Sequence, residues 1–368
     1  MKKLSDKTAV NSSQSFFPKV AVIMSAYQEE SIIRHKLKSL KEQNYPKDQL
    51  TFWIASDGSM DKTNQIIKDE CENLSNSHVF IFESRRGKPA VMNELVSRAK
   101  EFYDDIAFII ILTDANVIFK NDLVSFLVQP FIFPEISLVD SKIEPLYKVS
   151  KGIAIIEKFY LNRETLLKQS EGEWKGLSMG ASGGCYAIRA IDYVPVPKGF
   201  LVDDFFISFN ILLNGKKAIL NTLAICFEEI SSSISIEFKR RRRISAGNFQ
   251  NLFYFIPFFT MKQLPLWFVF FSHKVIRWFG PLLLIFSLLS MFYFAFYQVI
   301  VLFGVLILTL FMVFVFVFNK LFENINILLP FLKRVQYFIV INAALLMGFF
   351  DYLNGIKNNV WEPTKRNQ

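Results

Sequence analysis

The sequence predicts an α/β fold with a mostly parallel sheet and flanking helices, followed by an α-helical transmembrane region. Two observations lead to this prediction. Within residues 19–113, short apolar runs alternate with polar segments of helix length, which is the pattern of βαβ units. From Pro281 to Phe318 the chain has no Asp, Glu, Lys or Arg, and soluble domains almost never carry so long an uncharged run.

The composition limits the class of protein. The chain has 368 residues, of which 52% are hydrophobic and 20% charged, so it is not intrinsically disordered and has room for a sizeable core. Three scattered cysteines exclude a disulfide framework and give no zinc-type ligand pair. The formal charge is +9. Because the basic residues collect beside the apolar region, this excess indicates a membrane lipid partner and no nucleic acid.

The soluble region begins with strands and helices in alternation. Asp61 suits a helix N-cap, and Pro89 suits a first helical turn. The spacing predicts a parallel sheet with right-handed crossovers. The predicted strands are Val20–Ser25, Thr51–Ser56, Val79–Glu83 and Ile106–Thr113, and the predicted helices are Glu29–Glu42, Asp61–Asn73 and Pro89–Phe102.

The uncharged run is too long for one membrane crossing. As a helix it would extend roughly 57 Å, about twice a hydrocarbon core of roughly 30 Å. We expect spans over about 280–297 and 299–318, and a third segment over 335–355 that either crosses or is re-entrant. Residues 246–279 are aromatic but interrupted by Pro257, Lys262 and Pro265, which favours an interfacial amphipathic segment.

Basic residues lie on both sides of this predicted hairpin, which places both of its ends in the cytoplasm. Residues 1–18 are a polar tail without an apolar segment, so we expect the domain over 19–245 to be cytosolic. The expected location is therefore the cell membrane, with several crossings and a cytoplasmic soluble domain. Whether there are two, three or four crossings stays open, and with it the side on which the tail over 357–368 lies.

Polar clusters follow all four predicted strands, at the edge where open α/β sheets bind ligands. Basic side chains beside a glycine suit phosphate oxygens, and carboxylate and amide oxygens suit Mg²⁺ or Mn²⁺ on a diphosphate. The chain has no Gly-rich loop ending in Lys-Ser/Thr and no GxGxxG, which excludes P-loop NTPases and dinucleotide dehydrogenases. The clusters are Ala26–Glu29, Asp57–Ser59, Arg85–Lys88 and Asp114–Asn116.

Nearly the whole chain carries segments that resemble one family, and they come in the family's order. Ser56–Thr63 is similar to a DDGS-x-D-x-T box, and Thr113–Asn116 stands where a metal-binding DxD normally lies. Val202–Asp204 is similar to an ED catalytic element. Further similar segments are Val22–Glu30, Leu40–Pro46, Gly87-Lys88 with Asn93, Gly183–Arg189, Arg240–Ile244 at a QxxRW position, and Trp361–Arg366. The family is the family 2 glycosyltransferases, in particular their membrane-anchored bacterial members that build surface polysaccharides.

This resemblance implies a GT-A fold with a Rossmann-like sheet, a nucleotide-diphosphate sugar donor, usually UDP-linked, and inversion at the anomeric carbon. The acceptor would be a lipid-linked or growing saccharide. The residues it implies are Ala26, Tyr27, Glu29, Asp57, Gly87, Lys88, Asp114, Arg240 and Arg243 for the donor; Asp114 and Asn116 for a divalent metal, Mg²⁺ or Mn²⁺; Asp204 with Asp203 for catalysis; and Gly183, Gly184, Trp361 and Arg366 on the acceptor side.

Direct displacement needs a base close to the acceptor hydroxyl, and a carboxylate can serve. It also needs the charge on the departing diphosphate to be neutralised. In an extended segment, neighbouring side chains point to opposite faces, so we expect only one of Asp203 and Asp204 to face the site. The family pattern selects Asp204 as the general base.

The sequence departs from the family pattern at three positions. Asn116 replaces the second acid of DxD, and Arg240 and Ile244 replace the Gln and Trp of QxxRW. These changes keep a second hypothesis open, a nucleotide-sugar sensor of the same fold that has lost catalysis. A transporter is disfavoured because the two clear spans, over 280–297 and 299–318, contain no Asp, Glu, Lys or Arg. The basic run from 239 to 243 has an alternative role on anionic lipid headgroups.

Overall fold

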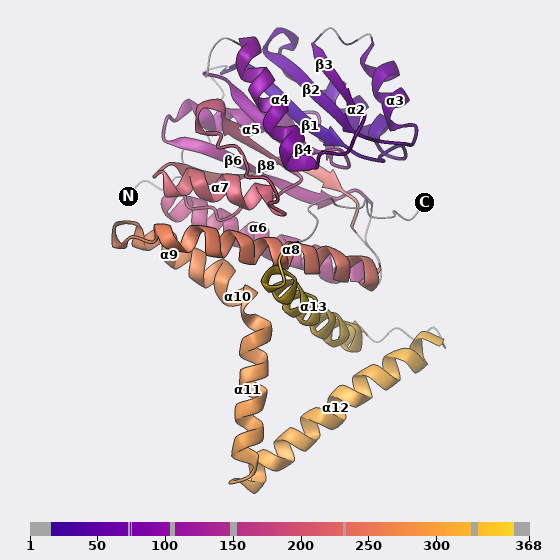
Figure 1. Cartoon of the computed structure of the whole chain (residues 1–368), viewed down its shortest axis with the longest axis vertical. Helices are drawn as coiled ribbons and strands as arrows, with labels where there is room; N and C mark the ends of the chain where they lie inside the picture. The colour runs from indigo at the N-terminus through magenta and orange to yellow at the C-terminus, as the bar shows by residue number, and fades with distance from the viewer. Residues whose placement is uncertain are drawn as a thin grey trace.

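The structure is a computed structural model in which residues 16–72, 74, 76–103, 107–147, 153–230, 233–324 and 330–356 are described. A sheet domain lies above a layer of long helices, and two further helices project from that layer (Figure 1). The described strands form one eight-stranded sheet in the order β3-β2-β1-β4-β7-β6-β8-β5. The strands are β1 (Val20–Ala26), β2 (Leu50–Asp57), β3 (Ser77–Phe82), β4 (Ile109–Asp114), β5 (Ile118–Phe119), β6 (Ile136–Pro145), β7 (Cys185–Arg189) and β8 (Lys217–Glu228).

The first half of the sheet is parallel, as predicted. β1 lies between β2 and β4, and β3 forms the edge beside β2. β1 and β2 are almost entirely buried, which explains their near-continuous apolar sequences. The helices that connect these strands are α2 (Ile33–Lys41), α3 (Thr63–Cys71) and α4 (Lys88–Tyr103).

Two of these helices begin later than predicted, because their first residues form turns. The carbonyl of Glu29 accepts the N–H groups of Ile32 and Ile33 before α2 begins. Asp61 lies two residues before α3, and its carboxylate accepts the N–H of Thr63 at 3.1 Å. Asp61 therefore satisfies a free donor at the start of α3 without being the N-cap itself.

The second half of the sheet is mixed. β7 runs antiparallel to β4 and β6, while β6 and β8 are parallel and β5 is antiparallel to β8. Four of the seven pairings between described strands are thus parallel. The helices of this half are α5 (Leu123–Val128), α6 (Ile153–Lys175) and α7 (Asp203–Leu213), and the short 3-10 turns of the chain are Lys47–Gln49, Gln129–Ile132, Ala190–Asp192, Ile256–Phe258 and Met261–Gln263.

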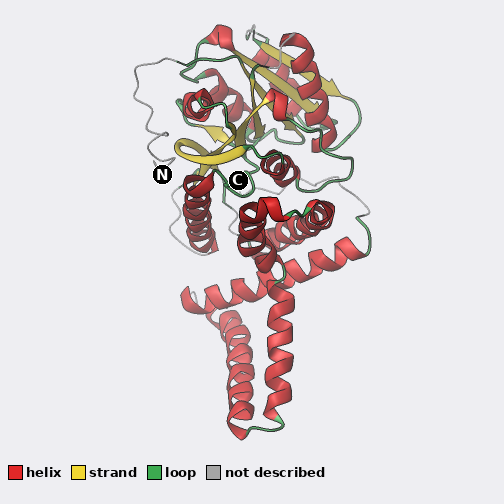
Figure 2. Ribbon diagram, turned by 90° about the vertical axis from the view of Figure 1, so that its left-hand side faces the viewer, coloured by secondary structure: helices red, strands yellow, loops and turns green. Residues whose placement is uncertain are grey.

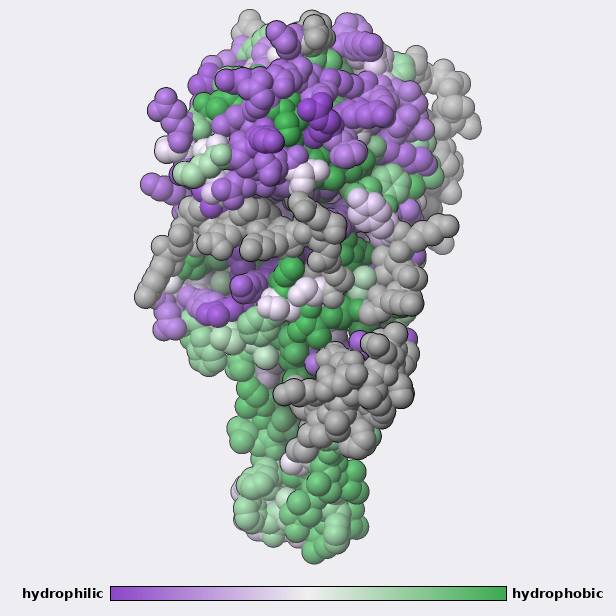
Figure 3. All heavy atoms as spheres, turned by 90° about the vertical axis from the view of Figure 1, so that its right-hand side faces the viewer, coloured by the Kyte–Doolittle hydropathy of each residue, from purple (hydrophilic) through white to green (hydrophobic). Residues whose placement is uncertain are grey.

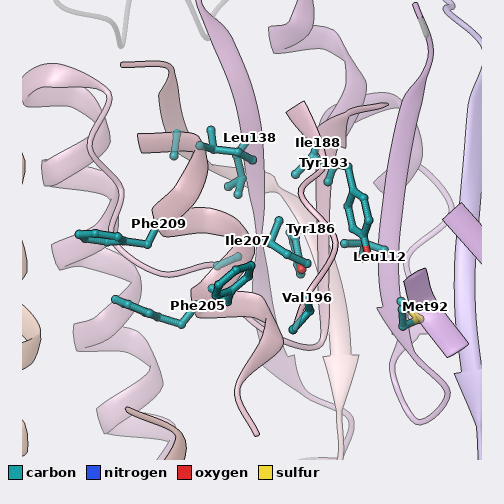
Figure 4. Packing of buried hydrophobic residues seen from close by; sticks show 14 of the residues in the cluster. Met92, Leu112, Leu138, Tyr186, Ile188, Tyr193, Val196, Phe205, Ile207 and Phe209 are labelled. Atoms are coloured by element: carbon teal, nitrogen blue, oxygen red, sulfur yellow. The ribbon is translucent and has the colours of Figure 1, made fainter. Parts of the chain in front are cut away.

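Two buried clusters, one on each face of the sheet, form the core. One of them contains Phe205 and Phe209 of α7 as well as Tyr186 and Ile188 of β7 (Figure 4). The same cluster includes Phe249, Phe255 and Trp267 among other residues of the segment 246–279. The predicted domain boundary at residue 245 therefore falls inside a helix, α8 (Ile234–Phe255), whose second half packs into the sheet domain.

After α8 the chain turns back along the same layer of helices through short helical pieces. It leaves the layer in the projecting helices and comes back to it in the last described helix. These pieces are α9 (Leu264–Val269), a π-helical turn (Phe270–Val275) and α10 (Ile276–Trp278), and the last described helix is α13 (Pro330–Leu353). α13 packs against α8. A Cβ on Gly348 would clash with the carbonyl oxygen of Arg242, and Ser245 donates a hydrogen bond to the carbonyl of Leu345 at 2.7 Å. The two backbones therefore approach closely.

The projecting helices are α11 (Gly280–Ala295) and α12 (Val299–Asn324), which meet at a short turn far from the sheet domain (Figure 2) and diverge from that turn (Figure 1). Their surface is hydrophobic, in contrast to the hydrophilic surface of the sheet domain (Figure 3). Phe286 and Leu289, for example, are 70% and 64% exposed. The two helices lie where spans were expected over 280–297 and 299–318, and that they cross a membrane stays a prediction.

Among the described residues, one helix taken alone is long and apolar enough to cross a bilayer, Leu332–Leu353 within α13. The segments Ile234–Phe258 and Met261–Trp278 would do so only together, and they are bent by 119°. α11 has 16 residues, fewer than the roughly 20 that a perpendicular span needs. The apolar helices are weak support for a membrane location.

Candidate active site

A cavity of about 320 Å³ opens at the carboxyl ends of the parallel strands. It lies where the polar clusters of the sequence were expected to meet, and side chains of α7 and α8 close its other side. Most of the predicted site residues line it. They are Tyr27, Glu29, Asp57, Gly87, Lys88, Asp114, Asn116, Gly183, Gly184, Asp203, Asp204, Arg240 and Arg243.

Three predicted site residues are not among those that line the cavity. The side chain of Ala26 is buried at the end of β1, and its neighbours Ser25 and Tyr27 line the cavity in its place. Trp361 and Arg366 lie outside the described residues. Their predicted part in the acceptor side therefore stays a prediction.

Asp57 orders the loop between β3 and α4. Its two carboxylate oxygens accept the N–H groups of Arg86 at 2.7 Å and Gly87 at 2.8 Å. Gly87 has a φ of +89°, a backbone conformation that glycine adopts without strain. Beside this loop, the guanidinium of Arg85 lies 3.6 Å from the ring centre of Tyr27, within the range of a cation–π contact.

The turn after β1 is held by two residues of the box before α3. Thr63 accepts the N–H of Glu29 at 2.8 Å, and Ser59 accepts the N–H of Gln28 at 3.1 Å. Gln28 has a φ of +52°, which is uncommon for a residue with a side chain. The box therefore fixes the position of Tyr27 and Glu29, in addition to contributing Asp57.

Lys88 lies between two acidic residues of the cavity. Its Nζ is 2.7 Å from Oδ1 of Asp114 and 3.4 Å from Oδ2 of Asp203. Burial alone would lower the pKa of Lys88, but Asp114, Asp203 and Asp204 outweigh that cost and raise it above its usual value. Lys88 is thus a permanent positive charge in the centre of the site.

Asp203 and Asp204 form the first turn of α7 and both line the cavity. The expectation that only one of them faces the site is wrong, because the segment is helical rather than extended, and neighbouring side chains on a helix diverge by only about 100°. Burial, followed by the charge of Asp203, raises the pKa of Asp204 to about 6. Oδ1 of Asp204 accepts the N–H of Phe205 at 2.8 Å.

The two glycines of the turn before β7 allow close packing against Asp204 and Val117. A Cβ on Gly183 would lie 2.6 Å from Oδ2 of Asp204, and a Cβ on Gly184 would lie 3.0 Å from Val117. Behind them, Asp140 accepts the N–H of Ser182 at 2.9 Å and pairs with Lys168 at 3.0 Å. Sequence reasoning missed this buried pair, because its members come from β6 and α6.

The basic run of α8 divides between two faces. Arg240 and Arg243 line the cavity, as the three-residue spacing of a helix allows. Arg241 instead pairs with the buried Glu157 at 2.6 Å, and Arg242 pairs with Asp351 of α13 at 2.5 Å. The guanidinium groups of Arg240 and Arg243 are therefore the two that could bind phosphate oxygens in the cavity.

Sequence reasoning also missed Glu228, at the end of β8. One of its carboxylate oxygens is 3.5 Å from Nδ2 of Asn116 and 3.8 Å from Nη2 of Arg240. It lines the cavity beside the predicted metal position. The strands predicted from the sequence all lie before residue 114. Nothing in the sequence therefore indicated that β8 ends at the edge of the sheet where the cavity lies.

The residues present suit a divalent cation in part. Asp114 and Asn116 offer hard oxygen atoms, and the ammonium of Lys88 already lies against Asp114, so the position favours positive charge. In the described part of the chain, no three acidic, His or Cys side chains gather into a ready-made metal site. The oxygens of a bound diphosphate would have to complete the coordination, as is usual for Mg²⁺.

The fold and site together define a class of protein. A half-parallel sheet with acidic, basic and amide groups at one edge is the arrangement of an enzyme that handles a nucleotide diphosphate. The chain matches two family models, described as "Glycosyl transferase family 2" over residues 21–189 and "Glycosyl transferase family group 2" over residues 179–319. Together they cover most of the chain, which belongs to the family 2 glycosyltransferases.

Curated relatives are similar over part of their length. The probable glycosyltransferase YdaM of Bacillus subtilis is 24% identical over 258 residues, which is 67% of this chain and 59% of that protein. The beta-monoglucosyldiacylglycerol synthase of a Nostoc species is 24% identical over 178 residues, 48% of this chain and 35% of that protein. The chain thus spans less than two thirds of the length of these relatives.

A solved structure shows the same fold over nearly the whole chain. It is the mannosyltransferase PcManGT from Pyrobaculum calidifontis, in complex with GDP-Man and Mn²⁺. The TM-score is 0.66 at 18% sequence identity, with 94% of this chain and 89% of that chain covered. The predicted GT-A fold, with its Rossmann-like sheet and following helices, is therefore confirmed.

Proposed function

We propose that the protein transfers a sugar, with inversion, from a nucleotide-diphosphate donor to a lipid-linked or growing saccharide at the cytoplasmic face of the cell membrane. One observation carries the proposal: a single cavity brings the basic Lys88, Arg240 and Arg243 together with the acidic Asp114 and Asp204. These are the charges that a departing diphosphate and an attacking hydroxyl require.

The donor would lie across the ends of β1, β2 and β4. Tyr27 would offer an aromatic face to the nucleobase, and Lys88, which follows the loop that Asp57 orders, would face the diphosphate. A divalent ion held by Asp114 and Asn116 would neutralise charge on the diphosphate as it leaves. UDP is the nucleotide that the family resemblance favours, while a structure of the same fold is in complex with GDP-Man and Mn²⁺, so both nucleotides belong in the test.

Asp204 would accept the proton of the acceptor hydroxyl. Its pKa of about 6 leaves it ionised at neutral pH and still basic enough to take a proton. Asp203 is held by Lys88 at 3.4 Å, whereas no hydrogen bond joins Asp204 to a side chain of the described residues. Arg240 and Arg243 would stabilise the leaving diphosphate through paired N–H donors.

The layer of helices beneath the sheet supports a membrane acceptor. α8 contributes two arginines to the cavity and packs on α13, which is apolar enough to span a bilayer. The relative in Nostoc is named as a synthase of a glycosyldiacylglycerol, a lipid product. A lipid-linked acceptor could therefore meet the site without leaving the membrane.

The test is transfer by detergent-purified full-length protein. We would supply UDP-, GDP- and dTDP-sugars in turn, with Mg²⁺ or Mn²⁺ and a membrane lipid extract, and measure nucleotide release and the mass of lipid products. Release of one nucleotide, with a lipid product heavier by a sugar, is expected. Saturable nucleotide-sugar binding without turnover for any donor in the presence of the extract would contradict the proposal and favour the sensor hypothesis.

A further inference from the structure

Lys36 is a completely buried lysine outside the groups to which we have given a role. It belongs to α2, and 0% of its surface is exposed. It lies under the strand end that carries Asp114 and Asn116, although nearly 80 residues separate them in the sequence. Burying an ammonium group costs several kcal/mol unless it is paired, so the contacts of Lys36 must offset this cost.

The ammonium group holds both ends of the loop that carries the predicted metal ligands. Nζ of Lys36 donates to Oγ1 of Thr113 at 2.9 Å and to the carbonyl oxygen of Val117 at 2.6 Å. Thr113 immediately precedes Asp114, and Val117 immediately follows Asn116. Nζ also lies 3.6 Å from the ring centre of Phe119, a cation–π distance.

These contacts reach the acceptor side as well. While Lys36 is protonated its ammonium group can only donate, so Oγ1 of Thr113 then accepts from Lys36 and uses its own proton elsewhere. That proton goes to the carbonyl of Gly184, 2.9 Å away. The same carbonyl accepts the N–H of Asp114 at 3.0 Å. Lys36 therefore fixes the direction of a hydrogen bond between the metal loop and the glycine turn beside Asp204.

A purely structural role explains the residue poorly. An apolar side chain of similar length would fill the space without the cost of a buried charge, and burial lowers the pKa of Lys36 to about 7, which shows how unfavourable the charge is there. No carboxylate bonds to it among the described residues; the ammonium bonds to one hydroxyl and one carbonyl. A lysine at this position is explained if holding the 114–116 loop in place matters more than the stability that an apolar side chain would add.

We infer that Lys36 is a positioning residue that holds the 114–116 loop in the geometry required for the metal and diphosphate. This inference rests on the proposed function, because it assumes that Asp114 and Asn116 meet a metal-bound nucleotide. Outer contacts of this kind typically change metal affinity by about 10- to 100-fold. The effect should therefore appear in metal binding itself, before any turnover.

The experiment measures Mn²⁺ binding by full-length protein in detergent, with UDP and with GDP, from the electron paramagnetic resonance signal of free Mn²⁺. Lys36→Met removes the ammonium but keeps the length of the side chain. We expect it to weaken nucleotide-dependent Mn²⁺ binding by about 10-fold or more, while nucleotide affinity without metal is unchanged. Lys38→Met is the control, because Lys38 is on the same helix, exposed, and 3.8 Å from Glu42.

Thr113→Val provides a second variant that leaves Lys36 in place and preserves the shape of the side chain. It should weaken Mn²⁺ binding in the same direction, and the double variant should lose less than the sum of the two losses. If Lys36→Met does not fold, Thr113→Val decides alone. Wild-type Mn²⁺ affinity in a folded Lys36→Met protein would overturn the inference. If Lys36→Met does not fold, wild-type Mn²⁺ affinity in Thr113→Val would overturn it. Absence of nucleotide-dependent Mn²⁺ binding in the unaltered protein would instead refute the proposed metal site, and the inference with it.

Discussion

Nζ of Lys88 lies 2.7 Å from Oδ1 of Asp114, so the candidate metal ligand carries a positive partner within the protein. The pair joins the loop after β3 to the end of β4, the two positions from which a diphosphate would be held. A metal ion that binds Asp114 has to share this carboxylate with Lys88 or displace it. The charge balance of the site therefore changes when donor and metal arrive together.

Asp114→Ala should weaken metal-dependent UDP binding, because it removes the carboxylate nearest the diphosphate position. We expect the affinity measured with Mn²⁺ to fall by at least about tenfold, a typical effect of altering a metal site, and the affinity without metal to change little. Titration calorimetry with and without Mn²⁺ checks this. Equal loss in both titrations would show that Asp114 contacts the nucleotide without a metal.

Asp204→Asn should strongly reduce transfer and spare donor binding, because it removes a base and no donor contact. A general base contributes about 10²- to 10⁴-fold to the rate, so turnover should fall within that range. Asp203→Asn is the matched comparison. Its carboxylate contacts Lys88, so it should affect donor affinity more than Asp204→Asn does. Turnover of Asp204→Asn at the wild-type rate would remove Asp204 from the mechanism.

The rate of transfer should depend on the ionisation of Asp204. Its pKa is raised from the usual 3.8 to about 6, by burial and by Asp203, and the base must be ionised to act. We therefore expect kcat/KM to fall about tenfold per pH unit below pH 6. A profile that stays flat down to pH 5 would be incompatible with this assignment.

Stability should change with pH in the opposite direction to activity. The folded state holds the proton of Asp204 more tightly than the unfolded chain does, because its pKa is raised on folding. Ionisation between about pH 4 and pH 6 therefore lowers the free energy of unfolding. In Asp204→Asn this contribution should disappear, which thermal unfolding of both proteins over that pH range would detect.

Gly183→Ala should lower turnover, because the new Cβ would lie 2.6 Å from Oδ2 of Asp204. The carboxylate would have to move, and displacements of about 1 Å in a reacting group can cost 10²-fold. Gly304→Ala in α12 is the control, since among the described residues nothing outside the backbone of its own helix lies within 4 Å of the added Cβ. Transfer kinetics in the same detergent compare the two; full activity of Gly183→Ala would show that Asp204 tolerates the shift.

The sequence predicts the first half of the fold well, for a local reason. Residues such as Val22 and Ile54 lie in short apolar runs that alternate with polar segments of helix length, which is the pattern of a parallel sheet. The polar residues after such strands share one edge of the sheet. This is why Asp57, Lys88 and Asp114 are brought together as predicted. The second half of the sheet has no such regular alternation, and β6–β8 and the helical state of Asp203–Asp204 depend on pairings over long distances.

The supporting contacts of the site could not be predicted for the same reason. Lys36 is an ordinary lysine in a helix pattern, and its burial is decided by Thr113 and Val117. Glu228 becomes a site residue only because β8 ends beside Asn116. A single sequence shows which residues have the chemistry, whereas the arrangement of the whole sheet decides which of them meet.

The close approach of α13 to α8 has a consequence for synthesis. Gly348 and Ser245 bring the backbones together, and α8 is the helix that holds Arg240 and Arg243 in the cavity. A nascent chain completes its acidic cluster early, but its arginines gain their packing partner only when about 100 further residues have been made. The sheet can thus form on the ribosome before α13 has been made, and α8 reaches its final surroundings only when α13 packs against it.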